Sequence, residues 1–347
     1  MSIREIFYLT AFTVLVGWIL SVGKTVILPF VVAVMLTYVL IGATHGLRRL
    51  PLMSALPVWL HYVLALLIFA LALAAITLVA VSNLRAIAQS QLAHEDEMLL
   101  LLTRFLEPLH LTDAPTWESL RTQLVDRLDL PRLSLGLLGA LASAGGYAVL
   151  MMTYMAFMVA ERGPLSRKVS LVIPDSGERD AALALFRRIN TQVVTYLSTK
   201  TLMNVILGTI SWILMWMLGI ENSVFWAFLI ALFNYIPYVG SIAGVALASA
   251  YTAFAYGDLK LAGLALVVLS LAQFYVGNLL EPRVMGRTLN LSPLTVLLAL
   301  VVWSTLWGVP GAIIAVPMTS ILMIILSAFK RTRPVAILTS RDGNLLH

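Results

Sequence analysis

The sequence predicts an all-α, polytopic integral membrane protein, built as a bundle of about eight transmembrane helices. Of its 347 residues, 60% are hydrophobic and only 12% are charged, whereas soluble domains carry about 25% charged residues. In the last third of the chain, two long apolar stretches, Ser223–Tyr256 and Leu291–Phe329, each carry helix breakers near their middle. Each stretch is too long for one ordinary span, so we expect two Pro/Gly-broken helical hairpins.

The charges and the lack of cysteine exclude several other classes of protein. The net charge is +6, but the basic residues lie in short loops between apolar segments, as cytoplasmic loops of membrane proteins do. The sequence has no cysteine, which excludes disulfides and thiolate metal sites. It also shows neither a zinc-binding histidine set nor a serine-nucleophile elbow. We therefore expect no enzyme activity, cofactor, metal site or nucleic-acid partner.

The N-terminal part, residues 1–82, is predicted to contain three spans of apolar residues: Ile6–Val22, Val26–Ile41 and Leu60–Val81. The first two are expected to form a tight hairpin that turns at Gly23-Lys24. The first stretch has the apolar character of a signal peptide, but no small-residue cleavage site ends it. A retained first span is therefore predicted.

Two polar segments flank the fourth span, which is predicted over residues 137–160. Residues 83–136 are rich in acids and carry leucines at helical spacing, which predicts short amphipathic helices outside the membrane. Residues 161–192 are basic and are predicted to form a cytoplasmic helical segment.

Residues 193–329 form the predicted transport core, and residues 330–347 a basic cytoplasmic tail. The core contains a fifth span, the first broken stretch, a further span over Leu259–Val276, and the second broken stretch. With basic loops inside and acidic ones outside, both termini are placed in the cytoplasm. The loops alternate correctly between the two sides of the membrane only if each broken stretch crosses the membrane twice or dips in and returns.

The two broken stretches then enter from opposite sides, the arrangement of an inverted repeat in transporters. Their sequences agree to a small extent. Residues 240–249 match residues 311–320 at four of ten positions, with Gly, Ile, Val and Ser in common. The residues that mark the two breaks, and that we expect to act as hinges, are Pro237, Gly240, Gly308, Pro310 and Gly311.

Asn234 lies at the first break, three residues before Pro237. Because proline has no amide hydrogen, it leaves a carbonyl upstream without its helical partner. Asn234 either satisfies such backbone groups or faces a transported solute. Gln273, within the apolar Leu259–Val276 segment, either makes a hydrogen bond between helices or lines a pathway.

Asn278 and Glu281 form the sharpest polar cluster, since residues three apart share a face of a helix. Pro282 disfavours helix at Glu281 and predicts that the span ends there. The Glu281 carboxylate either binds a cation or a proton, or neutralises Arg283 or Arg287 structurally.

Lys200 and Asn204 are four apart in the fifth span and share a face. Lys200 either extends to the cytoplasmic headgroups or is a fixed positive charge. In the second case it pairs with Glu281 or meets an anionic group of a substrate.

With these residues in view, the chain resembles the autoinducer-2 exporter family, also known as PerM-like permeases, most strongly from about residue 192 to 325. Many members of that family carry Gly-Gln shortly after the first motif, where this chain has Ser198-Thr199-Lys200-Thr201 and resembles a lysine-bearing subgroup. The motifs that carry the resemblance are Tyr196-Leu197, Asn234–Gly240 (NYIPYVG), Asn278–Gly286 (NLLEPRVMG), Leu289–Pro293 (LNLSP) and Gly308–Pro317 (GVPGAIIAVP).

The resemblance implies a multi-pass protein of the bacterial inner membrane that assembles as a homo-oligomer, as a pentamer by analogy. It implies export of a small polar solute such as autoinducer-2, coupled to protons or sodium. Three alternatives stay open: a Na⁺/H⁺-type antiporter, a passive channel, and a non-transporting membrane scaffold that docks partners.

Overall fold

The computed structural model describes residues 3–47, 60–68, 70–71, 146–161, 171–173, 175–285 and 290–343, with the single residues Pro57, Leu78, Ser82 and Lys168. The predicted external segment, residues 83–136, lies outside the described residues, as do Arg48, Arg49 and Arg287. The described elements are helices, with one isolated antiparallel bridge between Leu291 and Ser340.

The named helices are α1 (Ile3–Val22), α2 (Lys24–Leu47), α7 (Ser176–Met217), α8 (Ser223–Phe233), α9 (Val239–Tyr256), α10 (Leu259–Phe274), the π-helical turn η3 (Tyr275–Leu280), α11 (Glu281–Met285), α12 (Pro293–Ala328) and α13 (Arg333–Thr339). Among the described residues, four helical segments are long and apolar enough to cross a membrane: Lys24–Thr44, Ser176–Met217, Leu259–Val284 and Pro293–Ala328. Shorter apolar helices cover Thr10–Val22, Gly146–Glu161, Ser223–Phe233 and Val239–Ala253. The predicted helical membrane bundle is confirmed.

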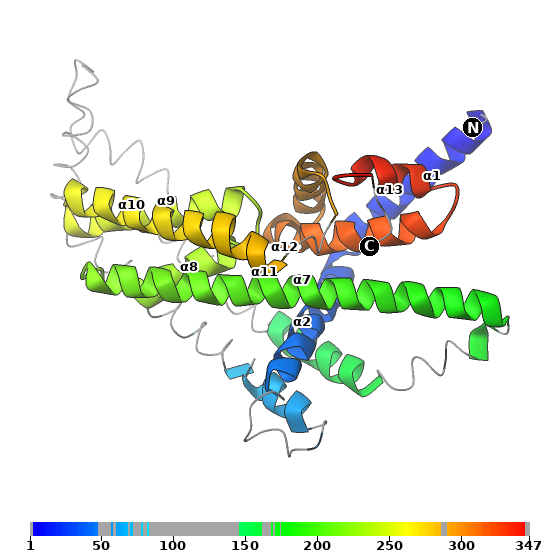
Figure 1. Cartoon of the computed structure of the whole chain (residues 1–347), viewed down its shortest axis with the longest axis horizontal. Helices are drawn as coiled ribbons and strands as arrows, with labels where there is room; N and C mark the ends of the chain where they lie inside the picture. Colours follow the sequence, from blue (N-terminus) through cyan, green and yellow to red (C-terminus); the bar gives the residue numbers. More distant parts are fainter. Residues whose placement is uncertain are drawn as a thin grey trace.

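The predicted tight hairpin at Gly23-Lys24 is wrong. Helical hydrogen bonds pass through this point, from the Gly23 N–H to the Ile19 carbonyl at 2.8 Å and from the Ile27 N–H to the Gly23 carbonyl at 2.9 Å. Accordingly, α1 and α2 follow one another in nearly the same direction (Figure 1). A single glycine followed by lysine, without a proline or a turn-forming partner, does not stop a helix.

The first broken stretch folds as a helical hairpin of α8 and α9. The two arms lie side by side, because the Trp226 and Tyr251 ring centroids are 4.8 Å apart. At the open end, the Tyr256 hydroxyl donates to the Gly219 carbonyl at 3.1 Å. The 11 residues of α8 rise only about 16 Å, about half of a hydrocarbon core. The first arm is therefore too short to cross the apolar layer alone, and the chain turns back at its tip.

The second broken stretch, within α12, is also a hairpin. Its two helical halves meet at Gly308, whose φ of 66° and ψ of −145° are not helical. The Trp303 indole N–H donates to the Thr319 hydroxyl at 3.0 Å. In a straight helix these residues would lie about 24 Å apart along the axis, so the second half folds back along the first.

Gly240 and Gly311 hold equivalent places in the two hairpins. A Cβ atom on Gly240 would lie 1.7 Å from the Phe233 carbonyl oxygen, and one on Gly311 would lie 2.0 Å from the Trp303 carbonyl oxygen. Each glycine therefore lets the second arm start against the backbone of the first, a contact that no other residue permits. These two glycines also begin the matching ten-residue segments, so the faint repeat in sequence has a geometric counterpart.

Helix α7 is the element on which both hairpins pack. Its 42 residues extend for about 63 Å, and the predicted fifth span is only its C-terminal part. In Figure 1, α8 lies along the C-terminal half of α7, whereas the second half of α12 runs toward the end where α7 begins. The other arm of the first hairpin, α9, packs against α8 and α10. The hairpins thus open toward opposite ends of α7, as the inverted arrangement predicts.

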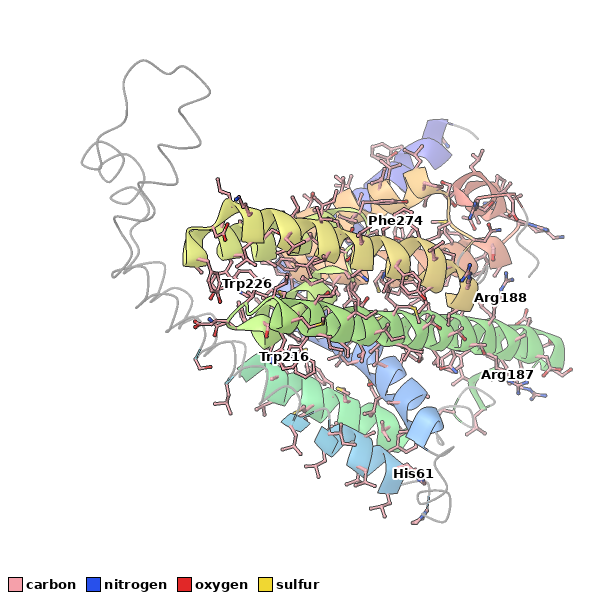
Figure 2. The ribbon with its side chains drawn as sticks, turned by 60° about the vertical axis from the view of Figure 1, so that its left-hand side comes forward. His61, Arg187, Arg188, Trp216, Trp226 and Phe274 are labelled. Carbon is pink, nitrogen blue, oxygen red and sulfur yellow. The ribbon has the colours of Figure 1, made fainter. Side chains whose placement is uncertain are left out.

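The two ends of α7 differ in chemistry. Trp216, near the C-terminal end, is 68% exposed, while Arg187 and Arg188 project from the N-terminal half (Figure 2). Trp216 and Arg187 are 29 residues apart, or about 43 Å, close to the thickness of a bilayer with its headgroups. This spacing matches an aromatic anchor at one interface and basic residues at the other.

Candidate functional site

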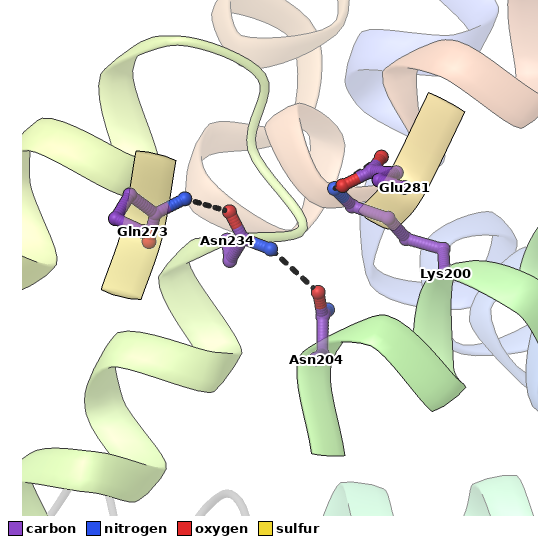
Figure 3. A network of polar contacts seen from close by, with 5 residues as sticks. All are labelled: Lys200, Asn204, Asn234, Gln273 and Glu281. Atoms are coloured by element: carbon purple, nitrogen blue, oxygen red, sulfur yellow. Dashed lines mark hydrogen bonds and ion pairs between the residues drawn. The ribbon is translucent and has the colours of Figure 1, made fainter. Parts of the chain in front are cut away.

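A buried ion pair joins α7 to α11. The Lys200 Nζ lies 2.8 and 2.9 Å from the two Glu281 carboxylate oxygens (Figure 3). The side chains are only 9% and 19% exposed, respectively. Of the alternatives left open by the sequence, the structure shows Lys200 paired with Glu281 and not extended to the membrane surface. Arg283, on the same short helix as Glu281, is exposed.

The predicted end of the span at Glu281 is wrong, because the chain stays helical through Pro282 to Met285. The π-helical turn η3 explains this. The Glu281 N–H bonds to the Val276 carbonyl, five residues back, so the wider turn absorbs the disruption caused by Pro282. Glu281 therefore lies inside the apolar segment Leu259–Val284.

The same wide turn separates Asn278 from Glu281. Asn278 is exposed, while Glu281 points toward α7. The prediction that they share a face assumed 3.6 residues per turn, and a π-helical turn holds more residues than that. Asn278 therefore lies outside the buried polar cluster.

Three amide side chains form a second buried group beside the ion pair. The Gln273 Nε2 donates to the Asn234 Oδ1 at 2.8 Å, and the Asn234 Nδ2 donates to the Asn204 Oδ1 at 2.8 Å (Figure 3). This amide chain links α10, the first break and α7. Asn204 and Asn234 are 3% and 5% exposed. The sequence identified each of the three as a candidate, but not their contact.

Both ends of the amide chain have hydrogen-bonding atoms without a partner. The Asn204 Nδ2 and the Gln273 Oε1 are buried and have no partner in hydrogen-bonding geometry, with the Tyr235 hydroxyl close to the Asn204 amide. Buried polar atoms are nearly always paired, because an unmade hydrogen bond in an apolar setting is costly. The chain therefore offers one donor and one acceptor to a water molecule or a polar solute.

A further contact fixes the tip of the first hairpin to α7, and sequence reasoning missed it. The Thr201 and Tyr235 hydroxyl oxygens are 2.8 Å apart. Thr201 and Tyr235 directly follow the candidate site residues Lys200 and Asn234. This adjacency is the sequence feature that could have identified them. The hairpin tip thus meets α7 through two neighbouring polar contacts.

The depth of these groups follows from helix geometry. Asn204 lies 13 residues before the end of α7 at Met217, or about 20 Å along the axis, and Lys200 about 26 Å. In a hydrocarbon core of about 30 Å, the amide chain lies well inside the apolar layer. The ion pair lies deeper from this end, toward the basic half of α7.

The second break supplies no polar side chain to this cluster. Gly308 and Pro310 are exposed and Gly311 is buried. The neighbouring Trp307 packs in an apolar cluster with Met35 and Val193, and its indole N–H donates to the Leu20 carbonyl at 3.0 Å. The second break therefore packs mainly against apolar groups.

Two cavities among the described residues lie elsewhere. One, of about 570 Å³, is lined mainly by apolar side chains of α2 and of the segments 62–66 and 155–160. The other, of about 460 Å³, lies along α1 between Phe7 and Trp18. Neither includes a residue of the ion pair or the amide chain. Within the described ranges, no cluster of metal-ligating side chains occurs.

Helices long and apolar enough to cross a membrane, two hairpins that open toward opposite ends, and polar groups buried beside the first hairpin are together typical of transport proteins. The family model described as AI-2E family transporter matches residues 7–331. The chain belongs to this family.

Curated relatives match over part of their length. The AI-2 transport protein TqsA of Escherichia coli (strain K12) is 33% identical over 208 residues, which cover 59% of this chain and 58% of TqsA. The putative transport protein YhhT of the same strain is 31% identical over 209 residues, covering 59% of this chain and 57% of YhhT. The putative permease PerM is 24% identical over 213 residues, covering 61% of this chain and 60% of PerM. The matched region thus spans less than two thirds of each relative.

Proposed function

We propose that this protein exports a small polar solute, autoinducer-2 or a related molecule, through the polar layer between α7, the first hairpin and α10. The similarity to TqsA, named an AI-2 transport protein, supports the choice of solute. The observation that carries the proposal is the amide chain, with the unpaired Asn204 Nδ2 and Gln273 Oε1. A neutral donor and acceptor inside the apolar layer suit a polar solute that gives and takes hydrogen bonds.

Movement of the first hairpin opens the pathway in this proposal. Its tip is held to α7 by the Asn234–Asn204 and Tyr235–Thr201 contacts. A solute that replaces these contacts with its own hydrogen bonds releases the tip. The backbone at the tip is already non-helical, since Tyr238 has a φ of 61°, and a hinge needs only a few such residues.

Glu281 is the proposed coupling group. When ionised it pairs with Lys200, as observed, and when protonated it loses that pair and lets the hairpins move. The titratable groups that face it are Lys200 and the buried Tyr196 from α7, with Tyr235 at the hairpin tip nearby. Protons or sodium ions are the coupling ions proposed for this site.

We further propose a bacterial inner-membrane location and assembly as a homopentamer. The basic C-terminal tail and the Arg187–Arg188 half of α7 are placed in the cytoplasm because basic residues concentrate there. The assignment of both termini to the cytoplasm stays a prediction, since the α1–α2 hairpin that it assumed does not form.

To test the function, the protein is reconstituted in liposomes and solute flux is measured with and without a pH gradient. We expect saturable flux that responds to the gradient in the parent and in the control Glu178→Gln, an exposed acid in the first turn of α7. Glu281→Gln should lose the response to the gradient. An unchanged response would eliminate Glu281 as the coupling group. Flux without saturation would instead favour a channel, and no flux together with stable protein partners would favour a scaffold.

A further inference from the structure

The Lys200 ammonium contacts the Glu281 carboxylate in a bidentate way. Its Nζ contacts both Glu281 oxygens at nearly equal distances of 2.8 and 2.9 Å. A bidentate carboxylate holds a cation in this way. Lys200 and Glu281 carry one charge each, so the pair leaves no net charge to attract a free ion.

Burial of the ion pair keeps other cations away from the Glu281 carboxylate. With 9% and 19% of the two side chains exposed, little water reaches the carboxylate. A second cation could bind only by displacing an ammonium that is covalently attached to α7 and always present. A buried carboxylate without any counter-charge is strongly disfavoured, so loss of the ammonium would force Glu281 to take up a proton or another cation.

Oxygen and amide groups suited to a monovalent cation lie on the same face of α7. Tyr196 and Asn204 are one turn before and one turn after Lys200, and both are buried. The Tyr196 hydroxyl oxygen, the Glu281 carboxylate and the Asn204 Oδ1, which also accepts from the Asn234 Nδ2 at 2.8 Å, are hard oxygen ligands of the kind that such cations prefer.

We propose that Lys200 is a tethered substitute for a free cation, so that the protein does not bind sodium at Glu281, and that removing the Lys200 charge opens a sodium site there. This inference rests on the proposed function, in which Glu281 is the coupling group. Of the two coupling ions proposed there, protons and sodium, it leaves the proton. It makes a claim about binding, which is measured without any transport.

The test is thermal unfolding of the purified, full-length protein in detergent, with sodium chloride compared with choline chloride at equal ionic strength. The parent should unfold at the same temperature in both salts. Lys200→Met should unfold at a higher temperature in sodium chloride, and this increase should saturate as the sodium concentration rises. The sodium dissociation constant of Lys200→Met should be at least about tenfold lower than any measured for the parent. Adding Glu281→Gln to Lys200→Met should abolish the sodium response.

Lys200→Arg is the matched control, because it keeps the positive charge and should remain indifferent to sodium. If Lys200→Met cannot be purified in either salt, Lys200→Gln takes its place. Glu281-dependent sodium binding by the parent would overturn the inference, and so would a folded charge-removed variant that ignores sodium. If the sodium responses are as expected but no variant transports solute, the proposed function fails and this inference stands.

Discussion

Removal of either partner of the Lys200–Glu281 pair should destabilise the protein more than removal of both. Lys200→Met leaves a buried carboxylate without its counter-charge, and Glu281→Gln leaves a buried ammonium. The double variant leaves two neutral side chains of similar size. The three variants and the parent form a double-mutant cycle that isolates the interaction.

The geometry sets the expected magnitude. Both oxygens are engaged at 2.8 and 2.9 Å, and neither side chain is more than 19% exposed. Breaking such a buried pair typically costs about 3–5 kcal/mol, whereas exposed pairs contribute about 0–1 kcal/mol. The ammonium left by Glu281→Gln can lose its proton, which reduces that cost. We therefore expect a coupling energy of at least about 2 kcal/mol.

Unfolding of the four proteins by a denaturing detergent, followed by circular dichroism, measures this energy. The double variant should lie closer to the parent than the Lys200→Met variant does. A coupling energy within about 0.5 kcal/mol of zero would show that the two charges do not interact in the folded protein. The buried pair, and the coupling role built on it, would then be wrong.

Three further predictions concern the hairpins and the amide chain. Gly311→Ala should cost about 1–3 kcal/mol or more, because its Cβ would lie 2.0 Å from the Trp303 carbonyl oxygen. The control Gly263→Ala, with no atom within 4 Å, should stabilise α10 by about 0.5–1 kcal/mol, and equal melting temperatures of the two variants would contradict the hairpin geometry. Gly308→Ala should cost about 1–3 kcal/mol through backbone strain alone, since no atom lies within 4 Å but φ is 66°, and a neutral effect on thermal unfolding would contradict the observed turn. Asn234→Leu should lower the free energy of unfolding by about 1–3 kcal/mol, because it leaves its two amide partners unpaired, and should reduce solute flux in liposomes; parent-like flux would remove the amide chain from the pathway.

The sequence predicted the helical bundle and the two hairpins, because proline and glycine within long apolar stretches have few structural meanings. The ion pair was among the alternatives, since Lys200 and Glu281 are the kind of charges that need a partner at membrane depth. The spacing of residues along the sequence could not show whether Glu281 pairs with Lys200 or with Arg283. That choice depends on how α7 and α10 pack, which is a property of the tertiary structure.

Two predictions from local sequence, a helix end at Pro282 and a turn at Gly23, are wrong. Pro282 predicted a helix end, but the π-helical turn before it kept the chain helical and moved Asn278 away from Glu281. Gly23 predicted a turn, although its neighbours continue the helical hydrogen bonds. A π-helical turn has no clear sequence signature, so the registers of Asn278 and Glu281 could not be fixed in advance.

Transport through the layer around Asn204 and Asn234 requires that water reaches these two side chains. Because the sequence contains no cysteine, Asn204→Cys and Asn234→Cys can each be labelled in intact membranes with a water-soluble, membrane-impermeant thiol reagent. Ala265→Cys, at a fully buried apolar position of α10, is the dry control. We predict that both network positions react, and faster with solute present, while the control does not. If both stay as unreactive as the control, the layer is dry and the transport pathway is not there.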